Sequence, residues 1–151
     1  MNAPSVLELY RRLTERGIPI WLDGGWGVDA LLGEQTRPHD DLDIVVEEKH
    51  LLRLRQLLES EGFKDVERDD SSAWNFVLGH DDGRLIDVHA IENGLIYPAG
   101  SLSGTGSVDG VAVQCLTAAL QLASRSGRTL RDKDLQDVNA LSRRFGLPRP
   151  T

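Results

Sequence analysis

The apolar residues of the chain follow two spacings, one typical of helices and one typical of strands. Recurrence every three or four positions predicts helices at residues 5–16, 26–32, 51–61, 117–123 and 131–145. Short apolar runs between turn residues predict strands at residues 18–22, 42–46, 63–67, 73–78, 85–90 and 111–113. This interleaved order predicts a mixed sheet of the α/β or α+β class, with helices on one side.

Two further segments carry local signals. Ser5 stands three residues before Glu8, a capping-box spacing that predicts the start of the first helix at Ser5. Residues 93–110 are rich in glycine and serine. We expect a long irregular loop there, with or without short strands, and long loops in compact domains are often functional.

Composition limits the class of protein and its partners. With 151 residues, of which 40% are hydrophobic and 27% charged, we expect one globular domain over residues 1–151. The net charge of −7 weighs against nucleic-acid binding, because an acidic chain repels the phosphate backbone. Cys115 is the single cysteine, which excludes an intrachain disulfide. The absence of a signal-peptide pattern and of a long apolar run leads us to expect a cytoplasmic protein without membrane contact.

Candidate chemistry begins with a glycine turn and two acids. Gly24 and Gly25 follow an apolar run and open a short helix, as in turns that approach phosphates. Asp41 and Asp43 stand two apart within the next apolar run, so both carboxylates point to one face of a strand. Oxygen ligands held this close suit a hard cation such as Mg²⁺ or Mn²⁺.

Asp87 is a third acid, embedded in the apolar strand at 85–90. If that strand lies beside the strand of Asp41 and Asp43, the three carboxylates converge. The plainer alternative places Asp41 and Asp43 on a solvated edge strand and makes Gly24-Gly25 an ordinary turn. The combination of turn, short helix and three acids favours a functional site.

These residues resemble the nucleotidyltransferase signature of the DNA polymerase beta superfamily. Among its members, the small antibiotic nucleotidyltransferases are most similar, namely the lincosamide enzymes and the aminoglycoside 2''-adenylyltransferase-like group. The resemblance covers residues 18–141 and rests on Gly24-Gly25-Trp26, Thr36-Arg37-Pro38-His39, Asp41-Leu42-Asp43, Ile86-Asp87-Val88-His89, Tyr97-Pro98 with Gly104 and Gly106, and Lys133-Asp134 with Asp137.

The resemblance implies a nucleotidyltransferase, polymerase beta-like α+β fold with a mixed five-stranded sheet and helices on one face. It implies transfer of a nucleoside monophosphate, AMP, from ATP or another nucleoside triphosphate to a hydroxyl of a small molecule, with two Mg²⁺ ions and release of pyrophosphate. Asp41 and Asp43 are then metal ligands. Asp87 is a third ligand, the general base, or both. A lincosamide or aminoglycoside antibiotic is the expected acceptor, and relatives imply a homodimer that completes the site.

Other residues carry weaker expectations for this site. Gly24 and Gly25 are expected to bring backbone N–H groups to the triphosphate, and Trp26 to line the pocket. Arg37 either contacts the triphosphate or is a solvated loop arginine. Lys133 either reaches phosphates or pairs with Asp137 at i, i+4.

The remaining expectations concern two histidines and two arginines. His39 either orders Asp41 through a structural hydrogen bond, which we favour, or faces solvent, whereas His89 either touches a substrate or is a half-buried strand residue. Arg125 and Arg128 stand where relatives often have a histidine and a tyrosine. They either bind phosphate or are exposed arginines near a helix end, and the second account is the simpler one.

Two rival functions remain open. One is a minimal nucleotidyltransferase that modifies a protein or RNA partner, as in toxin–antitoxin systems. The other is a non-catalytic nucleotide-binding module, against which the third acid counts.

Overall fold

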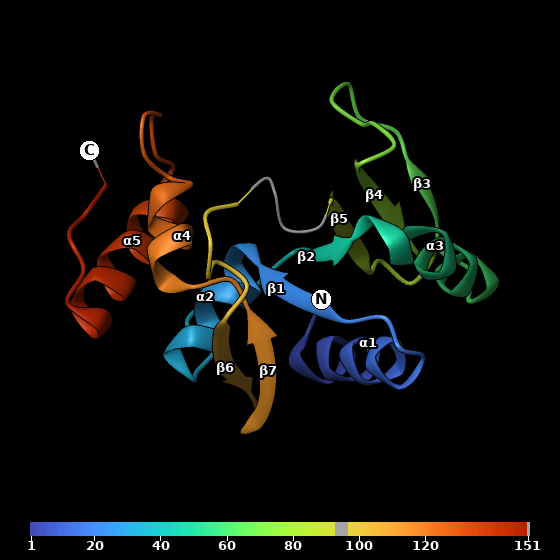
Figure 1. Cartoon of the computed structure of the whole chain (residues 1–151), viewed down its shortest axis with the longest axis horizontal. Helices are drawn as coiled ribbons and strands as arrows, with labels where there is room; N and C mark the ends of the chain where they lie inside the picture. The colour runs from blue at the N-terminus through green and yellow to red at the C-terminus, as the bar shows by residue number, and fades with distance from the viewer. Residues whose placement is uncertain (93–96, 151) are drawn as a thin grey trace.

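The computed structural model describes residues 1–92 and 97–150, and within them the chain forms an α+β fold (Figure 1). The helices are α1 (Ala3–Glu15), α2 (Gly24–Leu32), the short 3-10 helix η1 (Glu48–His50), α3 (Leu51–Ser60), α4 (Ala118–Ala123) and α5 (Asp132–Phe145). The strands are β1 (Ile20–Asp23), β2 (Leu42–Glu47), β3 (Lys64–Val66), β4 (Asn75–Gly79), β5 (Leu85–Ile91), β6 (Gly104–Val108) and β7 (Val111–Cys115). None of these helices is long and apolar enough to cross a membrane.

The strands form one mixed sheet in the order β3-β4-β5-β2-β1-β7-β6. β2 runs antiparallel to β1 and parallel to β5, which confirms the mixed sheet. The expectation of five strands is wrong, because the described part of the chain contributes seven. β3 pairs with β4 at one edge, and the β6–β7 hairpin joins β1 through the single pair Leu22 and Cys115 at the other.

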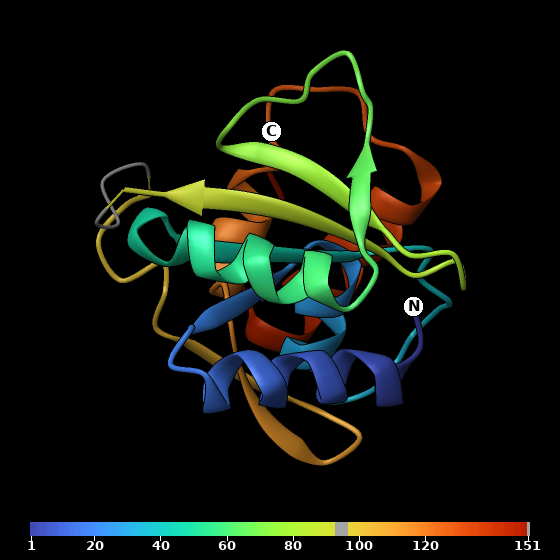
Figure 2. The same cartoon turned by 90° about the vertical axis from the view of Figure 1, so that its right-hand side faces the viewer.

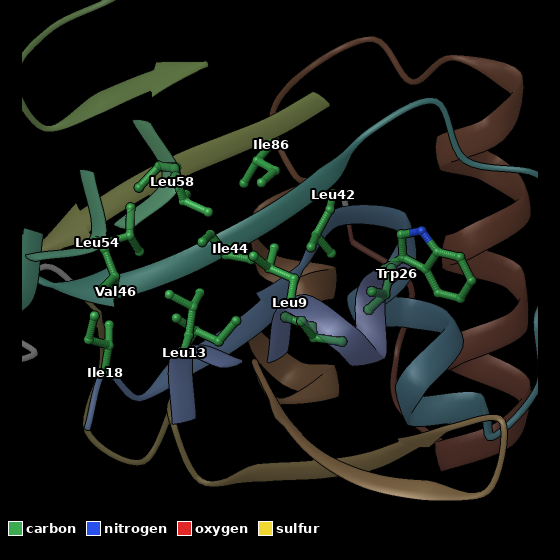
Figure 3. Close-up of a cluster of buried hydrophobic side chains, with 14 of the residues drawn as sticks. Leu9, Leu13, Ile18, Trp26, Leu42, Ile44, Val46, Leu54, Leu58 and Ile86 are labelled. Atoms are coloured by element: carbon green, nitrogen blue, oxygen red, sulfur yellow. The ribbon is translucent and has the colours of Figure 1, made fainter. Parts of the chain in front are cut away.

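Helices α1 and α3 cover one face of the sheet, where they lie side by side (Figure 2). Strand alternation sends the apolar residues of β1, β2 and β5 to this face, where they meet the apolar stripes of both helices. Figure 3 shows the resulting core, which includes Leu9, Leu13, Ile44, Leu54, Leu58 and Ile86. The opposite face therefore receives the polar members of the same strands, including Asp43 and Asp87.

The first helix begins earlier than its sequence predicted. Asn2 is the N-cap, and its side-chain oxygen accepts the backbone N–H of Ser5 at 3.0 Å. The predicted capping box at Ser5 is wrong because Asn2 supplies the same acceptor three residues earlier, with Pro4 tolerated in the first turn.

Helices α2, α4 and α5 form a second layer at the end of the sheet where β1 stops (Figure 1). Their contact is apolar and buries Val28, Ala118, Leu122, Val138 and Leu141. This cluster fixes α4 and α5 beside the Gly24-Gly25 turn, at the end of the sheet that carries the acids.

Candidate active site

The three acids converge on the sheet face opposite α1 and α3. Asp43 and Asp87 are direct partners in the register of the parallel strands β2 and β5, so their side chains share a face. Asp41 stands just before β2. One carboxylate oxygen of each of the three acids lies within 4.8 Å of the others. This spacing suits shared coordination of a cation by oxygen ligands.

The electrostatics of Asp43 fit that arrangement. Burial, followed by repulsion from Asp41, Asp87 and Asp23, raises the pKa of the Asp43 carboxyl to about 7, against a weaker opposing effect of Lys133. Burial and the neighbouring acids disfavour the charged form of this carboxylate, and a bound cation would stabilise that form.

Asp87 is held by two neighbours. Asn75 Nδ2 donates to Asp87 Oδ1 at 3.1 Å, and Arg68 Nη2 lies 3.2 Å from Asp87 Oδ2. Burial raises the pKa of Asp87 more than Arg68 and Asn75 lower it. A fixed, partly desolvated carboxylate is suited to ligate a metal or to accept a proton, and both roles stay open.

The glycine turn packs tightly against these acids. Gly24 has a φ of +56°, and a Cβ there would lie 2.0 Å from Asp43 Oδ2. A Cβ on Gly25 would lie 2.3 Å from His39 Nδ1. The Gly24 N–H is donated to Asp23 Oδ1 at 2.7 Å. Gly24 therefore allows a close approach to Asp43, and its N–H caps α2 in this structure; the expected contact of the turn with a phosphate stays a prediction.

A cleft of about 440 Å³ opens beside the acids. The Gly24-Gly25 turn, Asp41 and Asp43 line one side. The rest of the lining comes from residues 37–40 and from the α4 and α5 region, which contributes Asp134 and Asp137 as well as several cations. The cationic lining residues of the cleft are Arg37, Arg125, Arg128, Arg131 and Lys133. A cleft with carboxylates at one end and cations along its wall can hold a polyphosphate with its metal ion.

The predicted site residues Arg37 and Lys133 both line this cleft. Arg37 is no solvated loop arginine, since its Nη2 donates to Asp137 Oδ2 at 3.0 Å. The alternative pairing of Lys133 with Asp137 is absent among the described ion pairs, because Asp137 is engaged by Arg37 and Arg125.

Trp26 lies elsewhere. Its side chain is 2% exposed, belongs to the core of Figure 3, and donates from Nε1 to the Met1 carbonyl at 3.2 Å. The expectation that Trp26 lines the pocket is therefore wrong, because the helical turn directs its indole away from the cleft. The ring of His39 packs 4.9 Å from the indole. His39 is buried and makes a structural hydrogen bond as expected, but its partner is Asp29 and not the expected Asp41.

The sequence missed a set of buried polar residues in the cleft wall and next to it. Arg125 is 6% exposed and pairs with Asp137, so its predicted position at an exposed helix end is wrong, whereas Arg128 is exposed as expected. Asp29 and Gln121 are also buried. The sequence does carry one signal for Asp29. It is an acid between Val28 and Ala30 in an apolar helix, and a buried acid needs a polar partner.

The acid-bearing sheet face continues past Asp87 toward His89. The His89 ring lies 6.1 Å from the ring of Tyr97, and Trp21 donates from Nε1 to the Leu102 carbonyl at 2.8 Å. Burial, and then the charge of Asp23, raise the pKa of Tyr97 to about 12, so its phenol stays protonated. The predicted irregular loop at 93–110 lies partly outside the described residues, and its end forms β6.

Comparison with known proteins agrees with this geometry. The sequence profile of the aminoglycoside-2''-adenylyltransferase family matches residues 5–141. A lincosamide resistance protein of Staphylococcus haemolyticus is 30% identical over 150 residues, covering 90% of this chain and 89% of that protein. A 2''-aminoglycoside nucleotidyltransferase of Escherichia coli is 39% identical over 73 residues, 46% of this chain and 41% of its own length.

A solved structure is also similar over nearly the whole chain. The lincomycin-bound crystal structure of the lincosamide antibiotic adenylyltransferase LnuA superposes with a TM-score of 0.80. It is 26% identical and the match covers 94% of this chain and 97% of LnuA.

Proposed function

The chain belongs to the aminoglycoside-2''-adenylyltransferase family, and on this basis we propose that it transfers AMP from ATP to a hydroxyl of an antibiotic, with release of pyrophosphate. One observation supports this activity above the others. Three carboxylates meet within 4.8 Å of one another, and two of them, Asp41 and Asp43, line a cleft that five cationic side chains also line. A site for a metal–triphosphate complex needs both halves.

Asp41, Asp43 and Asp87 fit Mg²⁺ through the chemistry of their donors. All three offer carboxylate oxygens, which Mg²⁺ prefers, and the raised pKa of Asp43 is the expected property of a ligand without its ion. Bound there, two Mg²⁺ ions would neutralise the triphosphate and stabilise charge on the attacking and leaving oxygens.

The basic wall is assigned to the triphosphate. Arg37 and Lys133 line the cleft together with the turn, Arg37 close beside Gly25, and Arg131 precedes Lys133 at the start of α5. Cationic side chains here would hold the β- and γ-phosphates and favour departure of pyrophosphate. Gly24 and Gly25 contribute by leaving room, because any side chain there would fill the space next to Asp43 and His39.

We assign Asp87 to the acceptor. It accepts from Asn75 and pairs with Arg68, and the sheet face beyond it leads to His89 and Tyr97. An acceptor hydroxyl bound on this face would lose its proton to an Asp87 oxygen as its own oxygen attacks the α-phosphorus. Asp87 remains available as a metal ligand in the same complex.

We further propose that residues 1–151 act as one minimal domain in a homodimer. One continuous sheet carries both the acids and the acceptor face. The acceptor-face residues Asp87, His89 and Tyr97 do not line the cleft of the Gly24-Gly25 turn, so a second copy of the chain would enclose the acceptor beside them.

The test is incubation of the protein with ATP, Mg²⁺ and a panel of lincosamides and aminoglycosides, followed by mass spectrometry of the drugs. The expected product is a drug heavier by one AMP, with pyrophosphate released. Asp41→Asn should abolish it, and Asp81→Asn, an exposed acid in the β4–β5 turn, should not. AMP attached to protein or RNA in place of drug would support modification of a macromolecular partner, and ATP binding without transfer would support a binding module.

A further inference from the structure

A chain of polar contacts runs from α2 across the cleft wall. Asp29 Oδ2 lies 2.6 Å from His39 Nε2, and His39 Nδ1 lies 3.1 Å from Arg37 Nη1. Arg37 Nη2 then donates to Asp137 Oδ2 at 3.0 Å. The contacts thus connect α2, the loop before β2 and α5.

The chain of contacts returns to α2 by a second path. The Asp137 oxygen that accepts from Arg37 also accepts from Arg125 Nη2 at 3.2 Å. Arg125 Nη1 donates to Gln121 Oε1 at 2.9 Å, and Gln121 Nε2 donates to Asp23 Oδ1 at 3.1 Å. Asp23 caps α2 by accepting the Gly24 N–H. The result is a closed ring around the Gly24-Gly25 turn.

The donors and acceptors in the Arg37–His39–Asp29 part of the ring are fixed by chemistry. Arginine only donates, so His39 Nδ1 must accept from Arg37, and the ring proton of His39 must sit on Nε2. That proton is donated to Asp29, whose carboxylate also accepts from the Thr36 backbone and hydroxyl at 3.0 and 2.6 Å. Every charged member therefore has a partner, as burial requires.

Asp137 is the unexpected member. It is an acid, 2% exposed, in the wall of a cleft that would bind a polyanion. By charge alone, it should weaken nucleotide binding. Its contacts suggest a different role, because one of its oxygens holds both Arg37 and Arg125, which reach it from different elements.

We propose that Asp137 is a positioning residue that holds Arg37 and Arg125 in the geometry that binds the triphosphate, with the ring through His39 and Gln121 fixing both arginines to the glycine turn. This inference rests on the proposed function. Without the carboxylate, the arginines keep their charge but lose their common anchor, and the turn loses its link to α5.

The direction in which ATP affinity changes in one variant distinguishes a positioning role of Asp137 from a purely electrostatic effect of its charge. Asp137→Asn keeps the size of the side chain and removes a negative charge near the phosphates. Positioning predicts that the Kd and KM for ATP with Mg²⁺ rise about tenfold or more, roughly the loss of a charged hydrogen bond, while KM for the acceptor is unchanged. Charge alone predicts tighter binding. Asp132→Asn, an exposed acid of the same helix outside the ring, is the control and should leave the Kd within about twofold.

Two further measurements stay decisive if Asp137→Asn folds poorly, and a double-mutant cycle adds a third where that variant folds. Arg37→Lys keeps the charge on a partly exposed side chain but cannot contact both His39 and Asp137, so ATP binding should weaken similarly. In the wild-type protein, nitrogen-15 NMR of His39 should find the proton on Nε2. In a double-mutant cycle, Asp137→Asn should cost less in an Arg37→Ala background than in the wild type.

Each outcome decides a separate point. ATP binding that is unchanged or tighter in Asp137→Asn, normal binding in Arg37→Lys, or a proton on His39 Nδ1 would overturn the positioning role, even with drug transfer intact. A wild-type protein that binds ATP but modifies no antibiotic would instead overturn the proposed acceptor. Failure of the wild type to bind ATP with Mg²⁺ would overturn both.

Discussion

Replacing Asp43 with asparagine should stabilise the metal-free protein at neutral and higher pH while destroying its activity. The pKa of Asp43 rises from 3.8 to about 7, chiefly through burial and then through Asp41 and Asp87. Between these values the folded protein keeps a proton that the unfolded chain releases, so stability falls as pH rises from about 4 to about 7. A shift of about 3 pH units corresponds to roughly 4 kcal/mol above pH 7, as an upper bound.

The assay is urea unfolding of the wild type and of Asp43→Asn in the presence of EDTA, at several pH values between 5 and 8. The variant should be the more stable protein, by about 1 to 4 kcal/mol at pH 8 and by less at pH 5. Mg²⁺ should stabilise the wild type by mass action and have little effect on the variant. Asp81→Asn is the control for a lost surface charge. A variant no more stable than the wild type at pH 8 would refute the assigned electrostatic strain.

Three other substitutions test the site and its support. Gly24→Ala should abolish turnover and lower stability more than Gly33→Ala, which can be compared by thermal unfolding; both glycines have positive φ, but only at Gly24 would a Cβ meet Asp43. Asp87→Asn should lower kcat by about 100-fold or more with a smaller change in KM for ATP, which steady-state kinetics measures; equal kcat values would exclude Asp87 from proton transfer and metal binding. Trp26→Ala should destabilise the fold by roughly 3 to 5 kcal/mol in urea unfolding, without changing KM for ATP in the folded fraction. A raised KM would show that the indole contributes to the nucleotide site.

The sequence predicted well those features that depend on local periodicity. The helix–strand order, the mixed sheet and the shared face of the acids follow from apolar spacing and from strand alternation. The β6–β7 hairpin was harder to predict, because its glycines and serines carry little apolar signal. Trp26 was misplaced because its motif position is next to the turn, whereas the direction of a helical side chain depends on where the helix packs.

The ring of polar contacts in the cleft wall could not be predicted from the sequence. Its contacts join residues far apart, such as Arg37 and Asp137, and no spacing rule relates them. Arg125 illustrates the difficulty. An arginine near a helix end is exposed by default, and only the burial of Gln121 and Asp137 beside it turns this one inward.

The direct pairing of Asp43 with Asp87 has a consequence for how the protein folds. The two carboxylates come together only after β2 and β5, separated by the whole α3–β3–β4 segment, have docked side by side. A transition state reached before that docking offers no completed set of ligands, so Mg²⁺ cannot speed its formation. We therefore expect Mg²⁺ to slow unfolding and to leave the refolding rate nearly unchanged in stopped-flow experiments.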